Sequence, residues 1–228
     1  MKQLTHYDIE NKQQQFPITI VCDAIRTPEN IGMCFRISES FGVNKIFLHE
    51  SSPSIENRNV KRTARNTDTQ VKHEIYTDFN LLINKLKEEG NTIIGIEIAD
   101  ESIRIQDFDF TSKEKIVLLL GSERNGIENI NLVDATVAIP MYGRNSSMNV
   151  IHSLSIALYE TTNQLNKNII LDSIANVITV FAFQAIEYIL GGLFILKLYT
   201  YASEFSVLPQ LPLNIVTIVF AILLAASL

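Results

Sequence analysis

The sequence lacks the glycine patterns of the common nucleotide-binding loops. It contains neither the dinucleotide fingerprint G-x-G-x-x-G nor the phosphate loop G-x-x-x-x-G-K-S/T. The pair Gly191–Gly192 lies in an apolar stretch without the context of a phosphate loop. These absences disfavour an enzyme that depends on a dinucleotide or a nucleoside triphosphate.

Cysteine and positive charge are also scarce. Cys22 and Cys34 both lie among apolar residues without metal-ligand spacing, so we expect reduced core thiols in a cytosolic protein and no metal site. The formal net charge of -6 argues mildly against a nucleic-acid partner, although binding needs only a local basic patch. Residues 1–15 are polar and contain no apolar run, so no secretory signal is expected.

Charged side chains almost disappear towards the C-terminus. From residue 167 onwards the charged residues are Lys167, Asp172, Glu187, Lys197 and Glu204. This change predicts a charged globular domain of residues 1–166 and a hydrophobic helical tail of residues 167–228.

Two segments of the tail are candidates for membrane association. Val177–Leu196 has the length of a bilayer span and is interrupted by Gln184 and Glu187, whereas Leu213–Leu228 is marginal in length. A glutamate at the bilayer centre costs roughly 2–3 kcal/mol, which counts against a full crossing. The alternatives are an extension that folds onto the domain or its dimer, and a tail without a selected function.

Short apolar runs that alternate with helical patterns predict an α/β domain. The predicted strands are Phe16–Cys22, Lys45–His49, Thr92–Ile98, Lys115–Leu120 and Ala135–Pro140. Helices are predicted up to about Phe41, over Asp78–Glu89 and from about Ser147 to Leu165. This alternation indicates a mostly parallel sheet flanked by helices, in which ligands bind beyond the carboxyl ends of the strands.

Three segments rich in polar residues and glycine follow predicted strands. They read PENIGMCFRISESFGV (Pro28–Val43), LLLGSERNGI (Leu118–Ile127) and IPMYGRNSSMNVIHSLSIALYE (Ile139–Glu160). In this order they resemble the three signature motifs of the SpoU family, the TrmH-like branch of the SPOUT superfamily, over about Ile18 to Leu165. One block alone is a weak signal, whereas the three together are highly specific.

The resemblance implies an RNA methyltransferase that uses S-adenosyl-L-methionine and modifies a ribose 2'-hydroxyl of tRNA or rRNA. It also implies a deep trefoil knot, a rare exception to the rule that chains do not thread through loops. In the family, the knot joins the second and third motifs into a pocket for the bent cofactor, and the helices beside it usually form a homodimer. We therefore expect a cytoplasmic homodimer, with membrane association through residues 177–228 as an open alternative.

The second and third motifs hold the candidate residues of the cofactor pocket. Gly121 follows an apolar strand, where a glycine lets a ligand approach the backbone closely. Ile139, Met141 and Met148 offer an apolar, polarisable lining for an adenine. Ordinary packing at strand ends is the alternative. The full candidate set is Leu120, Gly121, Ile139, Met141, Ser147 and Met148.

Arg36 and Asn30 are the candidate catalytic residues of the first motif. Methyl transfer from a sulfonium requires that the ribose oxygen is held in line and loses its proton. In the family, the arginine that matches Arg36 is proposed as the base, although a guanidinium has a pKa above about 12 and barely deprotonates. Either the site lowers this pKa, or Arg36 clamps an RNA phosphate while another group takes the proton.

Glu123 and Asn149 are the candidate catalytic residues of the other two motifs. Glu123 is predicted to position either the neighbouring loop or Arg36. Asn149 starts the last predicted helix, where its amide bonds loop backbone or only caps the helix. Many family members have serine where this chain has Ile151, so a hydroxyl role is not expected at that position.

The segment Asn57–Lys72 is the predicted RNA contact. If it is helical, Arg58, Arg62 and Arg65 form one basic stripe, and Lys61 completes the candidate set. Arginine forks suit phosphate oxygens, so this stripe is expected to position RNA and not to read its sequence. A solvated charged face is the alternative.

The leading hypothesis is therefore a 2'-O-ribose methyltransferase, with tRNA slightly favoured as the substrate. Only about fifteen residues precede the first predicted strand, so a separate N-terminal RNA-binding domain is not expected. One rival is a non-catalytic knotted RNA-binding module, which predicts decay in the motifs. The other is a membrane-tethered interaction protein.

Overall fold

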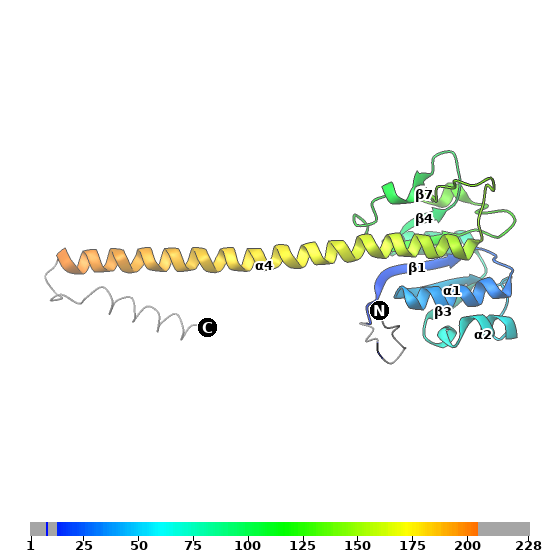
Figure 1. Ribbon diagram of the computed structural model, residues 1–228, viewed down its shortest axis with the longest axis horizontal. Coiled ribbons are helices and arrows are strands. Elements are labelled where there is room, and N and C mark those ends of the chain that lie inside the picture. Colours follow the sequence, from blue (N-terminus) through cyan, green and yellow to red (C-terminus); the bar gives the residue numbers. More distant parts are fainter. Residues whose placement is uncertain (1–7, 9–12, 205–228) are drawn as a thin grey trace. The chain divides into compact units, whose positions relative to one another are not determined.

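The computed structural model describes residue 8 and residues 13–204, with backbone alone at residues 180, 182–190 and 192–204 (Figure 1). The chain falls into two units, Met1–Asn168 and Ile169–Leu228. The three motifs all belong to the first unit.

A seven-stranded parallel sheet forms the centre of the first unit. Its strands are β1 (Phe16–Cys22), β2 (Val43–His49), β3 (Lys72–Tyr76), β4 (Thr92–Ile96), β5 (Ile103–Arg104), β6 (Ile116–Leu120) and β7 (Ala135–Ala138). They lie in the order β3-β2-β1-β6-β4-β7-β5, and every pairing between them is parallel. The predicted parallel sheet is thus confirmed.

Helices cover both faces of this sheet. They are α1 (Pro28–Ser40), α2 (Arg58–Ala64), α3 (Phe79–Glu88) and α4 (Val150–Glu204), with short 3-10 turns at Thr67–Thr69, Ile105–Asp107 and Ile130–Leu132. Successive side chains of a strand point to opposite faces of the sheet. The central strands β1 and β6 consist almost entirely of apolar residues, so both of their faces are apolar. Ile20 and Leu118 pack in the core with α1 and α4, whereas Val21 and Val117 pack in the core with α3.

Local sequence explains where the helices begin and end. Pro28 occupies the first turn of α1, where its missing N–H costs no hydrogen bond. Gly42 follows the end of α1 with a positive φ of 61°, a conformation that glycine adopts readily. The Asp78 carboxylate caps α3 by accepting a hydrogen bond from the Leu81 backbone N–H at 2.9 Å.

The predicted basic stripe is wrong at Arg65. Helix α2 ends at Ala64, because Arg65 and Asn66 both adopt left-handed backbone conformations with φ of 52° and 69°. The segment then forms a 3-10 turn, and strand β3, which the sequence analysis missed, begins at Lys72. Arg65 is therefore not part of a helical stripe with Arg58 and Arg62.

The last helix, α4, begins three residues later than predicted. Asn149 precedes it, and the Asn149 Oδ1 atom accepts a hydrogen bond from the Ile151 backbone N–H at 2.8 Å. Leu154, Ala157 and Leu158 of α4 are completely buried in the core of the first unit.

In the described part of the chain, no helix combines the length and the apolar character that a membrane span requires. Most of the predicted segment Val177–Leu196 and all of Leu213–Leu228 lie outside the residues whose side chains the structure describes.

Candidate active site

The parallel sheet brings the three motifs to one edge. In a parallel sheet the carboxyl ends of all strands lie on the same side, so the loops that follow β1, β6 and β7 are neighbours. The first motif follows β1, the second runs through the end of β6, and the third follows β7. Residues far apart in the sequence therefore meet there.

A cavity of about 610 Å³ opens at this edge. This volume lies in the range of small-molecule sites. The cavity is lined by the ends of β4 and β7, the loop after β6 and the start of α4, namely Ile96–Ile98, Gly121–Ile127, Val137–Ile139, Met141, Ser147–Val150 and Ser153.

Most of the predicted cofactor residues line this cavity. Gly121, Ile139, Met141 and Met148 do so, as does Ser147. Leu120 does not line it: this residue is completely buried, and its carbonyl oxygen accepts a hydrogen bond from the Asp23 backbone N–H at 2.8 Å.

Glu123 ties the second motif to the first. Its carboxylate accepts hydrogen bonds from the backbone N–H groups of Arg26 and Thr27, at 3.0 and 3.1 Å. It also accepts one from the side-chain amide of Asn30 at 3.0 Å. Glu123 thus binds the loop that leads into α1, and it forms no ion pair with Arg36 in the described part of the chain.

These hydrogen bonds keep Glu123 ionised. Partial burial raises the pKa of its carboxyl group, but the hydrogen bonds from the Arg26 backbone, Asn30 and Thr27 outweigh this effect and lower the pKa to about 2. The carboxylate is therefore a fixed negative charge at the rim of the cavity at neutral pH.

Asn30 joins all three motifs. Its side chain is buried, with 8% exposed, and its amide nitrogen donates to Glu123. Its amide oxygen accepts a hydrogen bond from the Asn149 side-chain nitrogen at 3.2 Å. Asn149 also caps α4. Its amide nitrogen binds the side chain of Asn30 and not loop backbone, so Asn149 is more than a pure cap but makes a different contact from the predicted one.

Arg36 lies six residues, or about 1.7 helical turns, beyond Asn30 on α1. Its side chain is exposed and is not among the groups that line the cavity. No hydrogen bond or ion pair joins its guanidinium to another of the described residues. The guanidinium is therefore available to an external anion.

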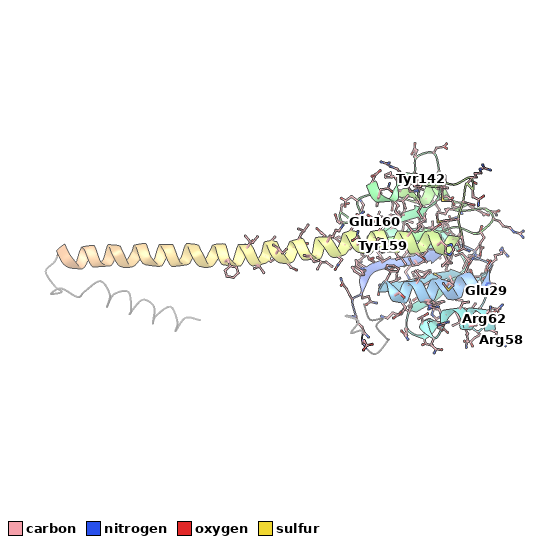
Figure 2. All side chains as sticks on the ribbon, viewed as in Figure 1. Glu29, Arg58, Arg62, Tyr142, Tyr159 and Glu160 are labelled. Atoms are coloured by element: carbon pink, nitrogen blue, oxygen red, sulfur yellow. The ribbon has the colours of Figure 1, made fainter. Side chains whose placement is uncertain are left out.

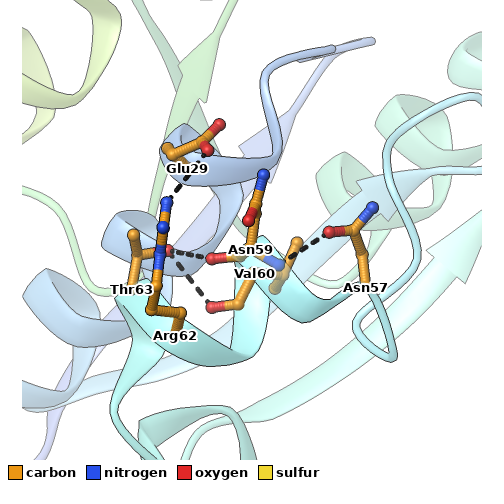
Figure 3. A network of polar contacts seen from close by, with 6 residues as sticks. All are labelled: Glu29, Asn57, Asn59, Val60, Arg62 and Thr63. Carbon is orange, nitrogen blue, oxygen red and sulfur yellow. Dashed lines mark hydrogen bonds and ion pairs between the residues drawn. The ribbon is translucent and has the colours of Figure 1, made fainter.

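The exposed cations of α2 differ in their surroundings. Arg62 forms an ion pair with Glu29 of α1 at 3.3 Å (Figure 3), and Lys61 forms one with Glu56. Arg58 is also exposed on α2 (Figure 2), and Arg65 follows the helix. Within the described residues, neither Arg58 nor Arg65 has an acidic partner, so these two are the better candidates for phosphate contacts.

Glu97 is a cavity residue that was not predicted from the sequence. It directly follows β4, and both of its carboxylate oxygens accept backbone hydrogen bonds. The available signal was an acidic residue at the end of an apolar strand. The predicted strand Thr92–Ile98 included Glu97, so this residue was not considered as part of a loop.

The two cysteines face each other in the core. Their Sγ atoms lie 3.7 Å apart, and both thiols are free and completely buried. Among the described residues, no group of three or more His, Cys, Asp or Glu side chains is arranged to hold a metal ion.

Comparison with known proteins identifies relatives of the first unit. Residues 17–159 match the SpoU rRNA methylase family. An uncharacterized tRNA/rRNA methyltransferase of Borreliella burgdorferi is 30% identical over 169 residues, which cover 70% of this chain and 72% of that protein. The tRNA (guanosine(18)-2'-O)-methyltransferase of Escherichia coli K12 is 25% identical, over 67% of this chain and 66% of its own length.

Solved structures share the fold. An rRNA methyltransferase from Sinorhizobium meliloti with bound S-adenosylmethionine superposes with a TM-score of 0.62 at 23% sequence identity, over 67% of this chain and 58% of that chain. At this sequence identity the similarity shows a shared fold.

Proposed function

The chain belongs to the SpoU rRNA methylase family, and we propose that it transfers a methyl group from S-adenosyl-L-methionine to a ribose 2'-hydroxyl of tRNA or rRNA. One observation carries this proposal. Glu123, Asn30 and Asn149, one from each motif, form a continuous hydrogen-bonded chain at the rim of a cofactor-sized cavity.

The cavity fits a nucleoside cofactor. Ile139, Met141 and Met148 contribute to the apolar part of the lining. The missing side chain at Gly121 makes room for the backbone of Gly126, so this glycine shapes the loop that lines the cavity. When bound there, S-adenosylmethionine supplies the electrophilic methyl group.

The protein side chains hold the acceptor. The Glu123 carboxylate fixes the backbone at Arg26 and Thr27, and this fixes the start of α1, which carries Arg36. Arg36 contacts the RNA as a clamp on a phosphate or assists removal of the 2'-hydroxyl proton. Arg58 and Arg65 bind phosphates further along the RNA.

The test is transfer of labelled methyl from S-adenosylmethionine to bulk tRNA and rRNA by the full chain. Label is expected in RNA with the wild type and with Glu39→Ala, an exposed control on the same helix, and a loss of about 100-fold or more with Arg36→Ala. Because a 2'-O-methyl group blocks alkaline cleavage of the neighbouring phosphodiester, labelled alkali-resistant dinucleotides identify the ribose as the acceptor. A wild-type chain that binds RNA but neither binds the cofactor nor transfers label would overturn the proposal in favour of a binding module.

The same assay decides between the two RNA classes. We propose tRNA as the preferred substrate, so purified tRNA should accept more label than rRNA at equal nucleotide concentration. The reverse ratio would assign the enzyme to rRNA.

The proposal also covers the oligomeric state of the chain and the path of its last helix. We propose a homodimer that packs through α4, where Ile156 is 39% exposed and Tyr159 (labelled in Figure 2) is 62% exposed. We also propose a trefoil knot formed by the same helix. Light scattering of the full chain tests the dimer, and a crystal structure tests the knot. We also propose a division into domains 1–166 and 167–228 and a cytoplasmic location; cell fractionation with and without residues 168–228 tests membrane association.

A further inference from the structure

Glu97 has no role in the reaction as proposed above, although it lies in the wall of the cavity. It follows β4, whose neighbours in the sheet are β6 and β7. Its side chain is half-buried, so its charge needs polar partners.

Both carboxylate oxygens of Glu97 have backbone partners. Oε1 accepts a hydrogen bond from the Ile98 backbone N–H at 2.9 Å. Oε2 accepts one from the Ile127 backbone N–H at 3.2 Å, across 30 residues of sequence. The second hydrogen bond joins the end of β4 to the loop Gly121–Ile127, which is part of the second motif.

This loop folds back on itself directly above the Glu97 carboxylate. Ser122 and Gly126 exchange two backbone hydrogen bonds, each of 3.1 Å. A Cβ atom on Gly126 would collide with Glu97 Oε2, and a Cβ atom on Gly121 would collide with the backbone of Gly126. Gly126 therefore packs closely against the Glu97 carboxylate on one side and Gly121 on the other, and neither glycine has space for a side chain.

The same loop carries Glu123 to the first motif. Its carboxylate binds the backbone of Arg26 and the side chain of Asn30, so the position of the loop determines where α1 begins relative to the cavity. A shift of the loop at Ile127 changes the shape of the cofactor site and displaces Glu123.

We propose that Glu97 is the positioning residue for the loop Gly121–Ile127, and that binding of S-adenosylmethionine depends on it. This inference rests on the proposed function for its cofactor. Glu97 acts through the loop, and its carboxylate holds the loop in the conformation that receives the cofactor before the cofactor arrives.

Two readouts on the full-length chain test this role. Hydrogen–deuterium exchange of peptides that cover residues 121–130 reports the loop without the cofactor, and calorimetric titration with S-adenosylmethionine reports binding. In Glu97→Ala, exchange in this loop should become faster, and the cofactor affinity should fall by about tenfold or more, the effect of losing a hydrogen bond to a charged group. Glu97→Gln keeps one acceptor oxygen and should lie between the wild type and Glu97→Ala. Glu101→Ala, which removes an exposed carboxylate four residues further along the chain, should match the wild type in both measurements.

Each outcome decides the proposal. Unchanged cofactor affinity in Glu97→Ala overturns it, and so does weakened affinity with unchanged exchange in the loop, because Glu97 would then contact the cofactor directly. If Glu97→Ala does not fold, Glu97→Gln is measured in its place with the same criteria. If the wild type binds no S-adenosylmethionine, the proposed function fails, and the exchange measurement still decides whether Glu97 holds the loop.

Discussion

The side-chain oxygen of Asn30 accepts a hydrogen bond from the side-chain nitrogen of Asn149 at 3.2 Å, although 119 residues separate them in the sequence. The other end of the Asn30 amide donates to Glu123. An asparagine suits this position because it offers a donor to the carboxylate and an acceptor to the second amide at the same time. The first motif is thereby attached to the two motifs that line the cavity.

Replacing the Asn30 amide by a carboxylate should therefore break this connection. In Asn30→Asp, an oxygen replaces the donor that faces Glu123 Oε1 at 3.0 Å, so two acceptors of like charge meet at a partly buried position. The free energy of unfolding at pH 7 should fall by about 1–3 kcal/mol, measured by urea denaturation. At pH 4 the two carboxyl groups, of Glu123 and of the introduced aspartate, can share a proton, which relieves their repulsion. The decrease in the free energy of unfolding should therefore be smaller at pH 4 than at pH 7. Asn129→Asp, at an exposed position, is the control, and equal effects of the two substitutions would contradict this account.

The lowered pKa of Glu123 predicts how stability depends on pH. The folded-state pKa of about 2 lies below the ordinary value of 4.5, so the carboxylate stabilises the fold above about pH 4.5 and this contribution is lost as the pH falls towards 2. Thermal unfolding of the wild type and of Glu123→Gln between pH 6 and pH 2.5 should show a difference in Tm that narrows in acid. A difference that stays constant over this range would mean that Glu123 is not held by ionic hydrogen bonds.

Gly126 and Gly90 provide a matched pair for the close contact at Glu97. Both have positive φ, 64° and 82°, so alanine at either position should cost about 1 kcal/mol of stability through backbone strain. A Cβ atom at Gly90 meets nothing within 4 Å, whereas one at Gly126 meets the Glu97 carboxylate. Only Gly126→Ala should also weaken the binding of S-adenosylmethionine, as measured by calorimetry. A similar loss of binding in Gly90→Ala would point to a general effect of destabilisation.

Arg58 and Arg65 have no acidic partner in the part of the chain that the structure describes, and this predicts a salt-dependent contribution to RNA binding. Removing one phosphate contact reduces the slope of log affinity against log salt by about 0.7–0.9. Arg58→Gln and Arg65→Gln should each show this reduction when tRNA binding is measured between 50 and 200 mM salt. Arg104→Gln removes an exposed arginine that is paired with Asp107 and should leave the slope unchanged. Slopes identical to the wild type in all three variants would place the RNA on another surface.

Much of the fold was predictable from local patterns. The strand at Phe16–Cys22 agrees with the structure at both ends, and the helix over Asp78–Glu89 agrees once its capping residues are set aside. The predictions failed where backbone conformation overrode side-chain pattern. The charges of Asn57–Lys72 have helical spacing, but left-handed conformations at Arg65 and Asn66 end the helix and allow Lys72 to join the sheet.

The sequence by itself determined the kind of protein this is. Alternating apolar runs and helical patterns indicate a parallel sheet, and three motifs in order indicate the family. Only the tertiary structure decided which residues of the three motifs are in contact. Hydrogen bonds act over about 3 Å, and the spacing of residues along the chain does not reveal which side chains come that close. Thus Glu123 binds the Arg26–Thr27 backbone and not Arg36, Asn30 lies between two motifs, and Glu97, inconspicuous at the end of a strand, lies under the loop of the second motif.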